Sequence, residues 1–99
     1  MARKKNPVVV NLPSEFQISL VNDKYDEFVK VIHEERPVVI DMAEVNSVDY
    51  AGLQLLYSLM RSCEEKELPF SLANLPSPIE KKIDLCGLDQ LKEGVHGSV

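Results

Sequence analysis

The sequence has no tryptophan, only two histidines and four glycines, and no long hydrophobic run. Its longest apolar runs, such as Val8–Val10, are far too short for the core of a signal peptide or for a membrane span. The glycines form no phosphate-binding pattern, and His33 has no second histidine near it with which to bind a metal. We therefore expect no direct membrane insertion, no metal site and no cofactor.

Cysteine is also scarce, and the two cysteines lie far apart in the sequence. Cys63 and Cys86 fit neither the C-x-x-C pattern of redox proteins nor the ligand spacing of a zinc site. Each lies on the apolar face of a predicted helix, so we interpret both as reduced residues of the core. Reduced thiols are typical of the cytoplasm, where we expect the protein to be found.

Basic residues are few beyond the first positions of the chain. Three of the eleven basic residues lie within residues 1–7, and all sixteen acidic residues follow them. An acidic body repels phosphate backbones, so we expect no binding to nucleic acid. We predict a basic disordered tail over residues 1–7, one domain over residues 8–93 and a disordered tail over residues 94–99.

Hydrophobic periodicity separates strands from helices along the chain. Apolar and polar residues alternate over residues 16–20, whereas apolar residues recur at helical spacing from Tyr25 to Ile32. Pro13-Ser14-Glu15 suggests a hairpin or an edge meander between the first two strands. Val38–Ile40 is typical of a strand buried on both faces. The predicted order is strand (8–12), strand (16–20), helix (22–36), strand (38–40), helix (51–66), strand (69–73) and helix (78–86), the last ended by Gly87.

This alternation predicts the α/β class: one domain with a mixed central β-sheet and helices packed on it. An edge strand such as residues 8–12 needs pairing or covering, which leaves a homodimer open. In open sheets of this kind, the functional surface lies at the carboxyl ends of the strands. That rule directs attention to the connection from Val38–Ile40 into Asp49.

The start of the second helix has two notable residues. Asp49 can accept hydrogen bonds from the unpaired backbone N–H groups of the first turn, as an N-cap does. Gly52 would leave the backbone open to close approach by a partner, and the helix N-terminus carries partial positive charge. The alternative is that Asp49 only caps the helix and Gly52 only packs, and the residues themselves leave both interpretations open.

The order of these motifs resembles the STAS family, which includes bacterial anti-sigma factor antagonists and the cytoplasmic tails of sulfate transporters. The resemblance lies in Val38–Val45, a buried strand that runs into Asp41, and in Val48–Leu56, which reads Val-Asp-Tyr-Ala-Gly-Leu-Gln-Leu-Leu. It continues in Ser71–Pro78 and in Leu85–Leu88, the next strand and the closing glycine-leucine pair. It covers roughly residues 8–93 and implies a STAS-type domain that binds another protein and catalyses no reaction.

The resemblance also implies a docking site. In anti-sigma factor antagonists, the serine just before the glycine is phosphorylated by a partner kinase, which breaks the fit between the two proteins. Ala51 occupies that position here and has no hydroxyl, so the usual serine switch cannot operate. Tyr50 precedes it and is more naturally a contact residue than a phosphate acceptor. The predicted partner-binding residues are Asp23, Ser47, Asp49, Tyr50, Ala51, Gly52 and Leu53.

Several partners remain open under this resemblance. The sequence Val-Asp-x-Ala-Gly-Leu also looks like the cytoplasmic STAS subunit of Mla-type phospholipid transport complexes, and similar loops occur in STAS proteins of chemotaxis systems. The partner could therefore be an anti-sigma kinase, a transport ATPase or a chemotaxis component. A nucleotide- or lipid-sensing module is a further alternative. Asp41 and Asp49 could suggest acid–base catalysis, but no nucleophile or base lies near them in the sequence.

Overall fold

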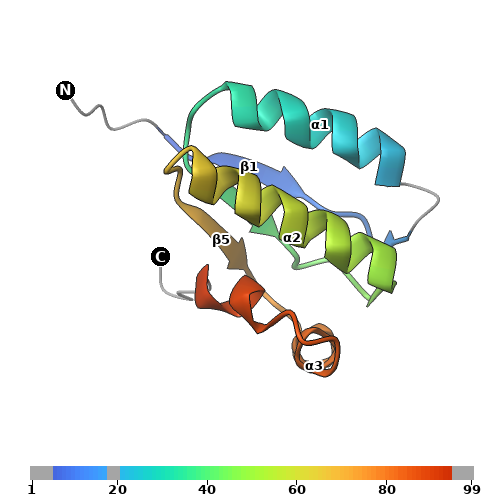
Figure 1. Cartoon of the computed structure of the whole chain (residues 1–99). Helices are drawn as coiled ribbons and strands as arrows, with labels where there is room; N and C mark the ends of the chain where they lie inside the picture. The colour runs from blue at the N-terminus through green and yellow to red at the C-terminus, as the bar shows by residue number, and fades with distance from the viewer. Residues whose placement is uncertain (1–5, 18–20, 95–99) are drawn as a thin grey trace.

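The computed structural model of the chain describes residues 6–17 and 21–94 (Figure 1). Four-residue strands alternate with helices, as the hydrophobic periodicity predicts. The elements are β1 (Val8–Asn11), β2 (Glu15–Phe16), α1 (Val21–His33), β3 (Val38–Asp41), β4 (Ser47–Val48), α2 (Tyr50–Glu65), β5 (Phe70–Ala73), α3 (Ser77–Leu85) and the 3-10 helix η2 (Asp89–Gly94).

The strands form two small parallel arrangements. The larger sheet has the order β1-β3-β5, with Val10 opposite Ile40 and Ile40 opposite Leu72. The smaller one pairs β2 with β4 and places Phe16 opposite Val48. Since β1 lies at the edge of its sheet, the edge position predicted for this strand is confirmed.

The predicted hairpin between the first two strands is wrong. β1 and β2 do not pair with each other, because each pairs in parallel with a strand that follows α1. The second of these, β4, lies in the stretch that we predicted to be a connection, since two residues are too short for any periodicity. Residues 18–20 of the predicted second strand lie outside the described residues. Every described strand pair is parallel, so the antiparallel pairing implied by a mixed sheet does not occur among them.

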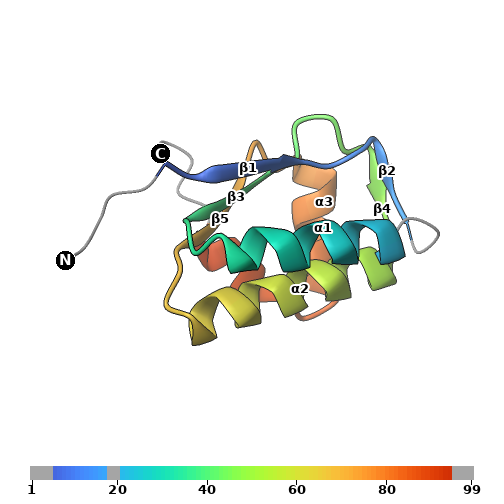
Figure 2. The ribbon, with the colours of Figure 1, turned by 90° about the horizontal axis from the view of Figure 1, so that it is seen from above.

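The helices α1 and α2 lie side by side on one face of the larger sheet (Figure 2). Val38 and Ile40 of β3 point into the core on that face and are buried, whereas Val39 between them is only half-buried. The prediction that β3 is buried on both faces is therefore wrong for Val39. On the neighbouring edge strand, Val9 is 54% exposed.

The helix ends follow local signals. Gly87 has a φ of 73°, the left-handed conformation that glycine adopts most easily, and it ends α3 as predicted. The helix begins one residue earlier than expected, because Pro76 occupies the N-cap position and Ser77 is already helical. The buried leucines Leu88 and Leu91 then dock η2 against the domain.

The two cysteines differ in burial, and we expect them to differ in reactivity. Cys63 is fully buried, and burial raises the pKa of its thiol to about 11. Its thiolate fraction is therefore about 100-fold lower than that of an ordinary cysteine at the same pH. Cys86 is half-buried at the end of α3. Iodoacetamide at about pH 8 should label Cys86 in the folded protein and Cys63 only after unfolding. Equal labelling by mass spectrometry would contradict this burial.

Candidate functional site

The start of α2 is fixed by Asp49, which acts as the predicted N-cap. Its carboxylate Oδ1 accepts a hydrogen bond from the backbone N–H of Gly52 at 2.9 Å, and its own carbonyl accepts from Leu53 at 3.1 Å. The backbone N–H of Asp49 donates to the carbonyl of Phe16 at 3.3 Å. The residue thus joins the first turn of α2 to strand β2, which holds this helix start in one position.

Replacing the capping aspartate should therefore loosen the site. We expect Asp49→Ala to lower the free energy of unfolding by about 1 kcal/mol, because one N–H of the first turn loses its partner. Urea denaturation of the variant and the wild type measures this difference. Asp26→Ala, an exposed position of α1, serves as the control and should change stability by only a few tenths of a kcal/mol. Equal stability of both variants would contradict the capping role.

Gly52 and Leu53 both face the interior of the domain. A Cβ added to Gly52 would lie 2.9 Å from the carbonyl oxygen of Phe16 and 2.9 Å from Cγ2 of Val48. Of the two interpretations left open by the sequence, the structure shows the packing one: this glycine permits a close approach to the chain's own strand β2. Whether a partner also contacts the backbone here stays a prediction. Leu53 is fully buried in the core. Both residues position the site, and both are buried, so the Leu53 side chain is not available to an incoming surface.

Tyr50 and Ala51 are the residues of this turn that reach the surface. The side chain of Tyr50 is 55% exposed, although it is a large aromatic group. Its hydroxyl accepts a hydrogen bond from the side-chain amide of Gln54, one helical turn further along. Ala51 is half-buried beside it. The start of α2 thus presents an exposed aromatic side chain, hydrogen-bonded to Gln54, next to a small residue.

The other two predicted site residues are Ser47 and Asp23, and the structure describes the surroundings of Ser47 alone. Ser47 belongs to β4 and is half-buried, and its backbone N–H donates to the carbonyl of Ser14 at 3.0 Å. Asp23 lies in the first turn of α1, two residues after its start, and not at the N-cap. Its side chain lies outside the described part of the structure. Whether a partner contacts either residue stays a prediction.

A lysine from α3 also belongs to this region, and sequence reasoning missed it. Lys82 Nζ donates to the carbonyl oxygen of Val48 at 2.6 Å, immediately before Asp49. No lysine or arginine occurs between Arg36 and Arg61, so the sequence around the loop itself supplies no basic residue. The two residues in contact are 34 positions apart in the sequence, so no local sequence pattern predicts the contact.

Asp41, the second carboxylate near this edge of the sheet, is engaged in local structure. It accepts hydrogen bonds from the backbone N–H of Ala43 at 2.9 Å and from the amide of Asn74 at 3.1 Å. These bonds stabilise the charged form and lower the pKa of Asp41 below its ordinary value. A carboxylate held in its charged form is a poor general acid at neutral pH, so its role here is to tie the end of β3 to the end of β5.

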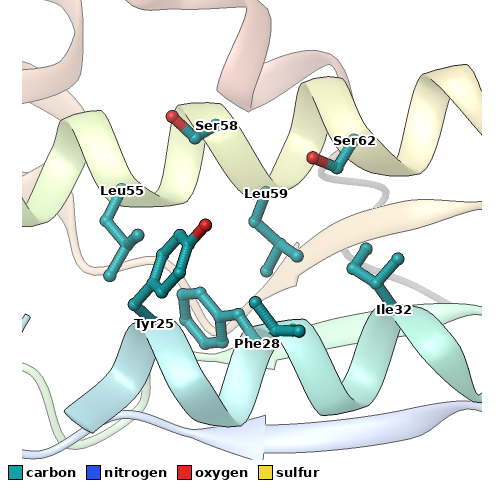
Figure 3. Close-up of a pocket in the computed structure, with 8 residues that line it drawn as sticks. Tyr25, Phe28, Ile32, Leu55, Ser58, Leu59 and Ser62 are labelled. Atoms are coloured by element: carbon teal, nitrogen blue, oxygen red, sulfur yellow. The ribbon is translucent and has the colours of Figure 1, made fainter. Parts of the chain in front are cut away.

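A shallow apolar groove of about 80 Å³ runs between α1 and α2 (Figure 3). Ligand pockets usually measure about 300–1,000 Å³, so this groove is too small to enclose a small-molecule ligand. Tyr25 stands at its rim and is 54% exposed. The groove is lined by Tyr25, Phe28, Val29, Ile32, Leu55, Ser58, Leu59 and Ser62.

Two further features bear on the possible functions. Over residues 6–17 and 21–94, no three histidine, cysteine, aspartate or glutamate side chains gather where they could hold a metal ion. Within the same residues, no helix combines the length and the apolar character needed to cross a membrane.

Solved structures with this fold come from several bacterial proteins. A sulfate transporter family protein from Wolinella succinogenes is 19% identical, with a TM-score of 0.73 over 88% of this chain and 72% of that one. An anti-sigma-factor antagonist (STAS) domain protein from Planctomyces limnophilus is 17% identical, with a TM-score of 0.74 over 85% and 77%. The Bacillus cell fate determinant SpoIIAA, in its phosphorylated form, is 19% identical, with a TM-score of 0.69 over 87% and 79%. At such low sequence identity, the structural similarity establishes a shared fold and nothing more.

The sequence itself provides the assignment to a family. No curated protein matches this chain in sequence. The family model described as "Mlab, STAS domain" matches residues 1–93, which is nearly the whole chain. The resemblance drawn from the motifs around Asp49 and Gly52 is thereby confirmed, as is the α/β fold class. The chain belongs to the STAS domain family.

Proposed function

We propose that this chain is a protein-binding adaptor that docks on its partner through residues 47–53, here named the docking loop. The observation that carries the proposal is the exposure of Tyr50 on a rigid support. Asp49 caps the turn from one side and the buried Gly52 packs against strand β2 from the other. An aromatic residue that is already ordered loses little conformational entropy on binding and offers a large apolar area.

The proposed adaptor lacks a phosphorylation switch at the position before the glycine. Ala51 has no hydroxyl, so a kinase cannot place a phosphate there. Under this proposal the docking loop stays in its binding form, and an anti-sigma kinase would be bound permanently. We expect the purified protein to carry no phosphate after incubation with a cognate kinase and ATP, whereas Ala51→Ser would accept one. Stoichiometric phosphorylation of the wild type would contradict the proposal.

A binding function also fits the chemistry of the site better than catalysis does. Asp41 holds the end of β3 through two hydrogen bonds, and Asp49 caps α2. Both carboxylates thus have structural tasks, and we propose no enzymatic activity. The free cysteines Cys63 and Cys86 suit a cytoplasmic location, which is where we place the protein.

A second candidate function is that of the cytoplasmic STAS subunit of an Mla-type phospholipid transport complex. The description of the matching family model, "Mlab, STAS domain", favours this candidate over a chemotaxis component. Both candidates use the same docking loop, and they differ in the partner: a kinase in one case and a transport ATPase in the other.

Capture of the partner from the native host tests the proposal and separates the candidates. The tagged wild type is compared with Tyr50→Asp and with Tyr25→Asp, the same substitution at a tyrosine of α1 that is equally exposed. We expect one protein to be captured by the wild type and by Tyr25→Asp and to be lost with Tyr50→Asp. Its sequence then identifies a kinase, an ATPase or a chemotaxis component. Survival of the same partner with Tyr50→Asp would overturn docking through this loop.

A further inference from the structure

Helix α3 carries two lysines and an exposed leucine, and one of the lysines reaches the docking loop. Lys82 contacts the carbonyl of Val48, the residue before Asp49. Lys81 and Leu85 lie four positions apart and Lys82 and Leu85 three apart, so the three side chains share one side of the helix. We name Lys81, Lys82 and Leu85 the α3 face. All three residues are exposed, and Leu85 reaches 88%.

The charge of the α3 face differs from that of the molecule, which carries a net charge of −5. The two carboxylates of α3, Glu80 and Asp84, lie 3.4 and 2.7 Å from Lys92 Nζ, on the side of α3 that meets η2. Among the described residues, no carboxylate forms a salt bridge with Lys81 or Lys82. The single lysine Lys92 thus pairs with both carboxylates of the helix. Lys81 and Lys82 lie on the other side, where Lys82 already donates one hydrogen bond to the carbonyl of Val48.

The position of the exposed Leu85 on α3 indicates a role for this side chain in binding. A single exposed leucine is common on protein surfaces and needs no explanation by itself. This one lies on the same side of α3 as two lysines without a carboxylate partner, and one helical turn from the contact between Lys82 and the docking loop. An apolar anchor within a charged rim is the usual composition of a protein interface.

We propose that the α3 face forms the second half of the docking surface. In this arrangement, the partner is a protein whose docking face carries carboxylates opposite Lys81 and Lys82, around an apolar pocket that receives Leu85. The proposal rests on the proposed function, in which Tyr50 forms the first half. It adds the charge of the partner, because the docking loop alone contains no basic residue. Opposite charges across an interface speed association and fix the orientation of the two proteins.

The test uses the protein that the wild type captures and Tyr50→Asp loses, purified and titrated by biolayer interferometry. Leu85→Ser should raise the Kd about 10-fold. Lys81→Glu should raise it about 10-fold at 50 mM salt and clearly less at 300 mM, since salt screens the repulsion. The matched controls are Val9→Ser and Lys30→Glu on other surfaces, which should stay within about twofold. Because all four residues are exposed, their substitution should keep the fold and change its stability by no more than about 0.5 kcal/mol.

The outcomes separate this inference from the proposed function. If Tyr50→Asp abolishes binding while Leu85→Ser and Lys81→Glu equal their controls, the α3 face is not part of the surface and docking through the loop stands. If Lys81→Glu strengthens binding, the partner is basic there, and the inference is overturned. If the wild type captures no protein that Tyr50→Asp loses, the proposed function fails and the α3 inference fails with it.

Discussion

Replacing Gly52 by alanine is expected to destabilise the domain by about 2 kcal/mol and to lower its Tm by about 10 °C. The added Cβ would lie 2.9 Å from the backbone oxygen of Phe16 and 2.9 Å from Val48 Cγ2, which is closer than real Cβ atoms come to other atoms. A backbone oxygen cannot move aside as a side chain can, so α2 would have to shift away from β2. This overpacking outweighs the gain of about 1 kcal/mol that alanine brings within a helix.

Thermal unfolding of Gly52→Ala measures this effect, and Gly87→Asn is its control. A Cβ added to Gly87 would meet no atom within 4 Å, and the φ of Gly87 is 73°. Asparagine tolerates that conformation, so Gly87→Asn should cost less than about 1 kcal/mol. The pair separates a steric requirement for glycine from a conformational one. A Gly52→Ala variant as stable as the wild type would mean that α2 and β2 are not in close contact.

The second large effect concerns binding. Tyr50→Ala should weaken the affinity for the captured partner at least about 30-fold, because a buried tyrosine at the centre of an interface contributes strongly. Tyr25→Ala removes an aromatic group with almost the same exposure, 54% against 55%, at the rim of the groove between α1 and α2. It should leave the affinity within about twofold. Isothermal titration calorimetry of the two variants decides between the two surfaces. A reversed result would place the partner on the groove.

The structural part of the site could be predicted because its signals are local. Asp49 caps a helix from three residues before Gly52, and this spacing alone predicts the observed hydrogen bond. The left-handed Gly87 ends α3 for an equally local reason. The helical period also gives the bounds of α2 to within about one residue.

The parts that could not be predicted depend on contacts between distant segments. Strand β4 has two residues and exists because it pairs with β2 across the intervening α1 and β3. The pattern around Gly52 fits a surface glycine as well as a buried one, and the position of Phe16 decides between them. Lys82 reaches the site from α3, and the hydrophobic periodicity of the sequence does not predict this contact.

In the larger sheet too, the local sequence predicts the strand, whereas the burial of its residues depends on distant segments. The apolar run Val38–Ile40 predicts a strand correctly, but how well each face is covered depends on where the helices pack. Because α1 and α2 lie on one face, Val38 and Ile40 are buried while Val39 is only half-buried (Figure 2).

Hydrogen–deuterium exchange of the chain, alone and with its captured partner, tests the central claim most directly. The account predicts slower exchange over residues 47–54 in the complex, with no change over residues 24–33 of α1. Slower exchange confined to α1, with residues 47–54 unchanged, would contradict the account, because the partner would then lie on the groove and the docking loop would serve structure alone.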